Sequence, residues 1–337
     1  MILPLHRDQQ QRLEEKLRRE LGPIVLAALD DADITEVMLN PDGVLWVESQ
    51  CHGMRDTGAR MSGIQAENLI GTVASMLGTV VNAGSPIVEG ELPLDGNRFE
   101  GILPPVSMAP VFVIRKRPRL IYTLNDYVAT GIMRPWHAEV IRDAITARQN
   151  IVIAGGTASG KTTLANALIH EMVALGDPAE RFVILEDTRE LQCAARNAVQ
   201  LHTGDVADLT RLTRVTMRLR PDRIIVGEVR GAEALALLKA WNTGHPGGVT
   251  TVHANSAAAA LMRLDTLIQE AGVPAQPHLV AEAVDVVVFM TRTLEGRRVE
   301  ELVRVTGCDP VIGYRLDIIT CDSQEGSHAN RHSSDRG

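Results

Sequence analysis

One nine-residue stretch, GGTASGKTT at residues 155–163, limits the folds open to this chain more than any other feature. It fits the phosphate-loop pattern G-x-x-x-x-G-K-[ST], with the apolar run IVIA before it and LANALIHEM after it. A short strand therefore enters the loop and a helix leaves it, as the pattern requires. The alternative is an ordinary glycine-rich turn before a helix, which the ordered strand, lysine, threonine and helix disfavour.

The residues of this loop share the task of holding a nucleotide phosphate. Glycines let the backbone turn tightly and aim N–H groups at phosphate oxygens, while the helix N-terminus adds its positive dipole. We expect Lys161 to reach the β- and γ-phosphates and Thr162 to supply a hydroxyl ligand to Mg²⁺. The sequence thus predicts ATP or GTP with Mg²⁺, bound by Gly155, Gly156, Thr157, Ala158, Ser159, Gly160, Lys161, Thr162 and Thr163.

The second half of the chain alternates short apolar runs with helical segments. IVIA, FVILE, RIIVGE and VTTVH are nearly continuous apolar strands, as expected where helices cover both faces of a sheet. The alternation predicts an α/β fold with a mainly parallel sheet and the nucleotide at the carboxyl edge of its strands. Three later runs, VDVVVFM, RVEELVRV and YRLDII, are expected to extend the sheet on one side as antiparallel strands.

The first part of the chain predicts a smaller α+β domain, residues 1–117. Its patterns indicate an amphipathic helix over 8–31, a hairpin in ITEVMLNPDGVLWVE, a helix over 63–78 and short strands over 86–117. We expect a linker at residues 118–134 and the phosphate-loop domain at 135–320. Residues 321–337 have no apolar periodicity, which predicts a disordered tail.

Acidic residues follow two strands of the predicted sheet. ILEDTRE brings Glu186, Asp187 and Glu190 to the edge where the nucleotide is expected. Carboxylates there could support Mg²⁺ through water, as Asp187 or Glu186 would beside Thr162, or orient the attacking water. RIIVGE ends in Glu228, and we expect this strand beside the phosphate loop with Glu228 polarising water.

Both acidic stretches also have structural interpretations. ILEDTRE would otherwise be a solvated acidic turn, and Glu228 a carboxylate at the start of a helix. The sequence leaves open which of Glu186, Glu190 and Glu228 is the catalytic base.

Two histidines bracket the fourth strand in TGHPGGVTTVHANS, His245 on a glycine-rich loop and His253 at the strand end. Imidazole at a nucleotide edge donates to the γ-phosphate and reports its loss, and its near-neutral pKa allows either protonation state. We therefore predict both as phosphate sensors. A structural role is the alternative for each, and a zinc site would lack a nearby cysteine or carboxylate.

Basic residues collect in IRKRPR between the two predicted domains, Arg115 and Arg117 among them. Such a run is either a solvated linker or a source of positive charge that reaches the nucleotide as the domains close. Arg98 in DGNRFEG is a further candidate of the same kind.

Composition disfavours several classes of protein. The chain has 337 residues, 45% of them hydrophobic, enough for two domains with cores, and no run approaches the length of a membrane span. The N-terminus lacks the apolar core of a signal peptide, which predicts a cytoplasmic protein with at most peripheral membrane contact. A formal net charge of −8 and only 3% aromatic residues disfavour direct nucleic-acid binding.

Taken in order, GGTASGKTT, ILEDTREL, RIIVGEVRGAEAL and TGHPGGVTTVHANS resemble the Walker A, Asp-box, Walker B and His-box of the type II/IV secretion ATPases. ITEVMLNPDGVLWVE and the stretches around RFEGILPPV and VFVIRK resemble the N-terminal domain of the same proteins. GEVRGAEAL, HANS and the short N-terminal module are most similar to the TrbB-type conjugal transfer ATPases. One departure is Ala158, where the family commonly has glycine; alanine fits if its φ is negative.

This resemblance implies a RecA-like ATPase domain behind a PAS-like N-terminal domain, hydrolysing ATP to power conjugative transfer or type IV secretion. It also implies a homohexamer at the inner face of the cytoplasmic membrane, docked on inner-membrane components of the mating-pair or secretion apparatus. Arginines of the N-terminal module or linker would touch phosphate, which we carry over to Arg98, Arg115 and Arg117. The alternatives are a pilus retraction motor of the same superfamily, a nucleic-acid translocase and a non-catalytic scaffold.

Overall fold

The computed structural model describes residues 7–49, 52–117, 121–204, 206–293 and 296–320. The chain divides into two units, residues 1–119 and 120–337, directly after the basic run IRKRPR. Each unit has its own hydrophobic core. Among the described residues, no helix has the length and apolar character that crossing a bilayer demands.

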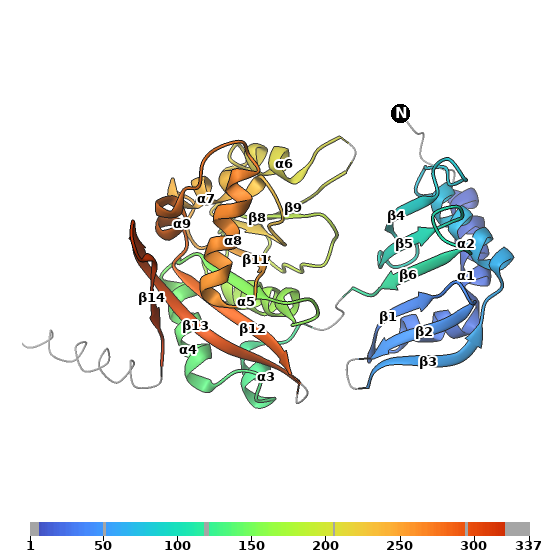
Figure 1. The fold of residues 1–337 in the computed structure, drawn as a ribbon, viewed down its shortest axis with the longest axis horizontal. Coiled ribbons are helices and arrows are strands. Elements are labelled where there is room, and N and C mark those ends of the chain that lie inside the picture. Colours follow the sequence, from blue (N-terminus) through green and yellow to red (C-terminus); the bar gives the residue numbers. More distant parts are fainter. Residues whose placement is uncertain (1–6, 50–51, 118–120, 205, 294–295, 321–337) are drawn as a thin grey trace, which may run out of the picture. The chain divides into compact units, whose positions relative to one another are not determined.

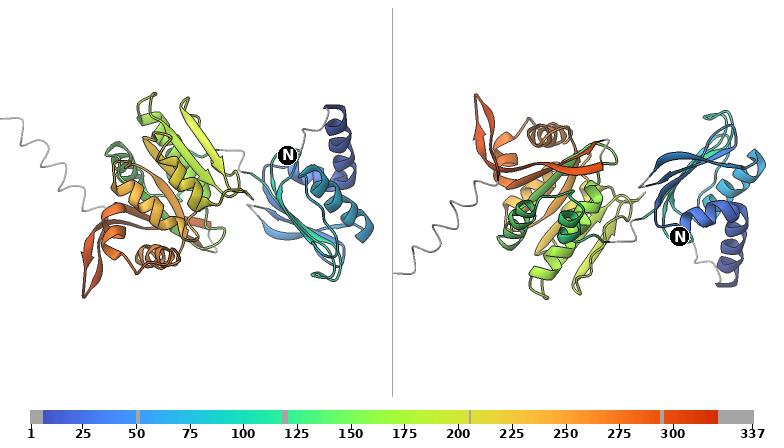
Figure 2. Two further views of the ribbon diagram at one scale, coloured as in Figure 1. Left: turned by 90° about the horizontal axis from the view of Figure 1, so that it is seen from above. Right: turned by 90° about the horizontal axis from the view of Figure 1, so that it is seen from below.

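Antiparallel strands form the sheet of the N-terminal unit. Side chains alternate along them, so that in β6 Phe112 and Ile114 are buried whereas Val113 is exposed. Helices α1 and α2 cover the buried face (Figures 1 and 2). Within the described residues the strand order is β3-β2-β1-β6-β5-β4, with β1 Ile34–Leu39, β2 Val44–Ser49, β3 Gly53–Arg60, β4 Ile87–Glu91, β5 Arg98–Ile102, β6 Val111–Arg115, α1 Arg7–Asp30 and α2 Gly63–Met76.

The N-terminal unit departs from the predicted elements in two places. The hairpin in ITEVMLNPDGVLWVE is present as β1 paired with β2, but the single helix predicted over 8–31 is wrong. Helix α1 is two helices joined at Gly22, where φ is 75°, directly before Pro23. Proline lacks an N–H and its ring clashes with the preceding turn, so the helix cannot run through it. Strand β3, GMRDTGAR, was not predicted because it has no apolar alternation.

The second unit contains a mixed, mostly parallel sheet with helices on both faces (Figure 2). Strand β7 (Ile151–Gly155) has buried side chains on both of its faces. Ile151 and Ile153 belong to one hydrophobic core, and Val152 and Ala154 belong to another. The strands of the described residues run in the order β14-β13-β12-β7-β11-β10-β8-β9. Their bounds are β7 Ile151–Gly155, β8 Phe182–Glu186, β9 Ala198–His202, β10 Arg223–Val226, β11 Val249–His253, β12 Val286–Thr293, β13 Gly296–Asp309 and β14 Gly313–Ile318.

The helices of this unit connect the strands. They are α3 Leu124–Ala129, α4 Pro135–Thr146, α5 Lys161–Leu175, α6 Leu209–Thr216, α7 Glu233–Asn242, α8 Ala257–Gln269 and α9 Pro277–Ala283. The predicted linker, residues 118–134, is therefore not a linker throughout, because α3 lies inside it. Leu124 and Tyr127 of α3 are buried in the second unit's core, which their isolated position in the sequence did not reveal. The predicted tail, residues 321–337, lies outside the described residues.

Two predictions about the sheet are wrong. Strand β12 is parallel to β7, not antiparallel; β13 and β14 are the antiparallel strands. The strand that leads to Glu228, β10, is not beside the phosphate-loop strand, because β11 lies between β10 and β7. Strand β9 was also missed. Periodicity identifies strands but does not order them, since the order depends on the path of each crossover.

Candidate nucleotide site

The phosphate loop joins the end of β7 to the start of α5, at the carboxyl edge of the parallel strands. A Cβ at Gly155 would lie 2.5 Å from both the Met290 carbonyl oxygen and Ser159 Oγ, so only glycine fits there. Gly160 has a φ of 96° and precedes α5, which begins at Lys161. The loop therefore turns tightly and points the first N–H groups of α5 toward an anion.

Ala158 lies in the left-handed region, with a φ of 58°, so the expectation of a negative φ is wrong. An L residue with a Cβ pays about 1–2 kcal/mol for this conformation, and glycine does not. Such strain persists only where surrounding contacts hold the backbone in place. The contacts around Ala158 are therefore part of what shapes the loop.

Lys161 is folded into the loop and only 7% exposed. Its Nζ donates hydrogen bonds to the carbonyl oxygens of Gly155 and Gly156, at 3.0 and 2.9 Å. His253 Nδ1 lies 3.4 Å from the same nitrogen. The ammonium charge is thus already held where the pattern places the phosphates.

His253 connects the phosphate loop to Glu228. It ends β11, the strand between those that lead to the other two groups, and its Nε2 is 3.0 Å from Glu228 Oε1. A lysine ammonium only donates and an ionised carboxylate only accepts, so a neutral imidazole protonated on Nε2 satisfies both contacts. The structure therefore brings three predicted residues, Lys161, His253 and Glu228, into one line.

Arg230 extends this line and was not predicted. Its Nη2 donates to Glu228 Oε2 at 2.7 Å, and its Nη1 is 3.6 Å from Asp187 Oδ2. The hydrogen bond to Glu228 raises the pKa of the Arg230 guanidinium above its usual value. The sequence signal for Arg230 was its position two residues after Glu228, because both residues follow the end of β10.

Glu186 holds the acidic loop in place. It is buried, and its Oε1 accepts hydrogen bonds from the backbone N–H groups of Glu190 and Leu191, at 3.0 and 2.7 Å. Asn166 of α5 fixes the same loop, because its Nδ2 donates to the Glu190 carbonyl at 3.1 Å and its Oδ1 accepts from Gln192 N at 2.7 Å. Asn166 is a polar residue inside the apolar run LANALIHEM, and this was its sequence signal.

Comparison with known proteins shows the family of this chain. The family model described as "Type II/IV secretion system protein" matches residues 55–322, most of the chain. The chain belongs to this family. It is 54% identical over 294 residues to the "Probable conjugal transfer protein TrbB" of Sinorhizobium fredii, covering 87% of this chain and 90% of that protein. It is 53% identical over 296 residues to the conjugal transfer protein TrbB of Rhizobium radiobacter, covering 88% and 91%.

Solved structures have the same fold. The Legionella pneumophila ATPase DotB matches with a TM-score of 0.58 at 20% identity, covering 83% of this chain and 78% of DotB. The pilus retraction motor PilT with bound ADP matches with a TM-score of 0.59 at 18% identity, covering 91% and 85%. The predicted fold class is confirmed: a mainly parallel α/β domain that carries the phosphate loop follows a smaller N-terminal α+β domain.

Hard oxygen donors, which Mg²⁺ prefers, occur in the phosphate loop and directly after β8. Thr162 and Thr163 lie in the first turn of α5 and are partly exposed. Asp187 is exposed, and its Oδ1 accepts from Thr203 Oγ1 at 3.0 Å. A magnesium ion bound with the nucleotide would be held by the threonine hydroxyl, phosphate and water. Asp187 is exposed and would reach such an ion through water, whereas Glu186 is buried.

His245 does not join the contacts around His253, and its role as a phosphate sensor stays a prediction. Its Nδ1 is 2.8 Å from the carbonyl oxygen of Pro221, in the segment that enters β10. His253 ends β11, whereas His245 precedes it. At about 3.3 Å per residue, the intervening strand separates the two histidines to opposite edges of the sheet.

Arg98 and Arg115 lie on the adjacent strands β5 and β6 of the N-terminal unit, and Arg117 follows the end of β6. Arg98 is directly opposite Arg115, which is opposite Glu36. Arg115 Nε is 3.6 Å from Glu36 Oε1, and Arg117 Nη2 is 2.8 Å from Glu91 Oε1. The three arginines thus form one charged cluster on the sheet, and their contact with phosphate stays a prediction.

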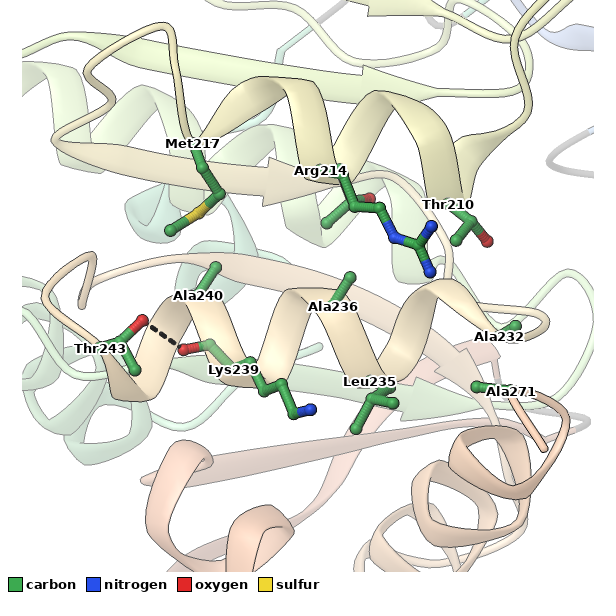
Figure 3. Close-up of a pocket in the computed structure, with 11 residues that line it drawn as sticks. Thr210, Arg214, Met217, Ala232, Leu235, Ala236, Lys239, Ala240, Thr243 and Ala271 are labelled. Carbon is green, nitrogen blue, oxygen red and sulfur yellow. Dashed lines mark hydrogen bonds between the residues drawn. The ribbon is translucent and has the colours of Figure 1, made fainter. Parts of the chain in front are cut away.

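A groove of about 300 Å³ lies between α6 and α7. In Figure 3, Arg214 of α6 and Met217, which directly follows α6, face Ala236 and Ala240 of α7. None of the described residues that line it is predicted to bind nucleotide or to catalyse hydrolysis. This groove is therefore separate from the candidate nucleotide site.

Proposed function

We propose that this chain is an ATPase motor that powers conjugative transfer or type IV secretion. The observation that carries the proposal is the line from Lys161 through His253 to Glu228, which joins a phosphate-binding charge to a candidate base. Family membership supports ATP hydrolysis in general. Identity of 53–54% to TrbB proteins over most of the chain favours the conjugative process.

In this proposal Lys161 and the loop N–H groups bind the β- and γ-phosphates, and Thr162 with water holds Mg²⁺. Glu228 draws the proton from the attacking water, and His253, in contact with both Lys161 and Glu228, responds to the γ-phosphate. Glu186 and Asn166 position the loop that carries Glu190. Arg98, Arg115 and Arg117 add positive charge from the N-terminal unit.

The physiological role is tested by conjugation. Deleting the gene from its own conjugative element should abolish transfer to a recipient, because the apparatus loses its motor. A plasmid copy of the wild-type gene should restore transfer, and a Lys161→Ala copy should not. Undiminished transfer in the deletion strain, with pilus retraction impaired, would contradict the proposal and favour a retraction motor.

We further propose that the motor is a cytoplasmic homohexamer, peripheral to the inner membrane components on which it docks. A ring limits how far neighbouring domains move, so that nucleotide-driven motion is passed from subunit to subunit. Sedimentation at micromolar protein with ATP and Mg²⁺ should show six subunits, and added salt should change the extent of assembly because the chain is acidic. A species that stays monomeric under these conditions would contradict the ring.

A further inference from the structure

The phosphate loop is contacted by an arginine that its motif does not contain. Arg297, at the start of β13, donates from Nε to the carbonyl oxygen of Ala158 at 3.1 Å. Its side chain also passes close to Gly160, where an added Cβ would lie 3.2 Å from Arg297 Cδ. The aliphatic stem of Arg297 therefore packs along the loop, and its guanidinium group holds the loop at Ala158.

Ala158, whose carbonyl oxygen accepts this hydrogen bond, also has a strained backbone conformation. Ala158 has a φ of 58°, a conformation that a residue with a Cβ adopts only where contacts enforce it. Loops of this kind bind anions because successive N–H groups point to one side, which requires the carbonyl groups to point away. A hydrogen bond to the Ala158 carbonyl opposes rotation of that peptide toward the phosphate side.

The sheet brings Arg297 to the loop from far along the chain. Strand β12 is parallel to β7, with Met290 opposite Gly155, and β13 returns antiparallel to β12 with Arg297 opposite Arg292. The Met290 carbonyl also closes the space beside Gly155. The β12–β13 pair thus contacts the loop at Gly155 and at Ala158.

We propose that Arg297 is a positioning residue that holds the phosphate loop in its anion-binding conformation and thereby sets nucleotide affinity. The proposal rests on the proposed ATP binding at this loop. Arg297 acts through the Ala158 peptide. It keeps that peptide oriented before nucleotide arrives, so that binding does not have to reorder the loop.

The test compares Arg297→Met, which keeps the length of the stem but removes every donor, with Arg298→Met as the matched control. Arg298 is the next residue of β13 and pairs with Glu300, away from the loop. In the full-length protein, Arg297→Met should bind ATP and ADP about 10-fold more weakly, the range expected for a lost charge-assisted hydrogen bond. Arg298→Met should bind both as the wild type does, and Arg297→Lys should recover part of the loss.

A second pair of variants separates positioning from direct phosphate contact. In an Ala158→Gly background the left-handed conformation carries no Cβ strain, so the same Arg297→Met change should weaken binding only about 3-fold. An arginine that touched the phosphate itself would cause an equal loss in both backgrounds, and this result would overturn the proposal. Melting temperatures of all variants should stay near that of their parent.

The possible failures are distinguishable. If the wild-type chain binds no ATP or ADP, the proposed function is wrong and the inference falls with it. If the wild type binds ATP and Arg297→Met binds it equally well, only the inference is overturned. A loss of affinity that is matched by a large fall in melting temperature, and shared by Arg298→Met, would also overturn it, because β13 would then act through folding alone.

Discussion

Lys161→Ala should abolish ATP hydrolysis, with turnover lower by roughly 10²-fold or more because the charge on the transferred phosphoryl group is lost. Lys161 Nζ is already held inside the loop by the carbonyl oxygens of Gly155 and Gly156, so the charge needs little reorganisation to act. Steady-state phosphate release from the purified protein measures the effect. Wild-type turnover in this variant would remove the site assignment.

The control for this variant is Lys239→Ala. Lys239 lies beside the α6–α7 groove (Figure 3), and no hydrogen bond of its ammonium group is found among the described residues. The Lys239→Ala variant should hydrolyse ATP as the wild type does. We expect Lys161→Ala subunits to assemble. In a ring, mixing them with wild-type subunits should then lower activity more than in proportion to their share.

Glu228→Gln should separate nucleotide binding from hydrolysis. Glutamine keeps the shape, and its carbonyl oxygen can still accept from His253, but the charge that draws a proton from water is gone. ATP should therefore bind with near-wild-type affinity while single-turnover hydrolysis falls by roughly 10²-fold or more. Glu228 also accepts from Arg230, so an increase in the mobility of Arg230 is expected as well.

Glu186→Gln is the informative comparison. Its side-chain oxygen accepts from the N–H groups of Glu190 and Leu191, and a glutamine oxygen can replace it there. Hydrolysis should therefore fall much less than in Glu228→Gln, and nucleotide affinity with and without Mg²⁺ shows whether Glu186 also supports the metal. Near-normal hydrolysis in Glu228→Gln together with an inactive, ATP-binding Glu186→Gln would reverse the assignment and make Glu186 the base.

The sequence predicted the edge of the sheet at which the acidic groups lie, but not their burial or their contacts. Strand ends predicted that Glu186 and Glu228 lie at one edge of the sheet, because parallel strands share a carboxyl edge. Burial then distinguishes them: Glu186 is 3% exposed and bonded to backbone, whereas Glu228 contacts His253 and Arg230. The residues next to each glutamate did not predict that Glu186 is the buried one.

The sequence by itself determined the phosphate loop, the α/β class and the approximate strands, because these depend on local chemistry. Glycine spacing, one lysine, one threonine and apolar runs of a fixed period act within a few residues of one another. The break of α1 before Pro23 was equally local and was overlooked.

Only the tertiary structure decided how these pieces meet. The contact of Lys161 with His253 spans 92 residues and that of Arg297 with Ala158 spans 139. Such contacts depend on the order of β7, β11 and β10 and on the parallel direction of β12, which follow from packing and crossover paths rather than from periodicity. For the same reason His253 joined the site and His245 did not, although the two stand eight residues apart on either side of one strand.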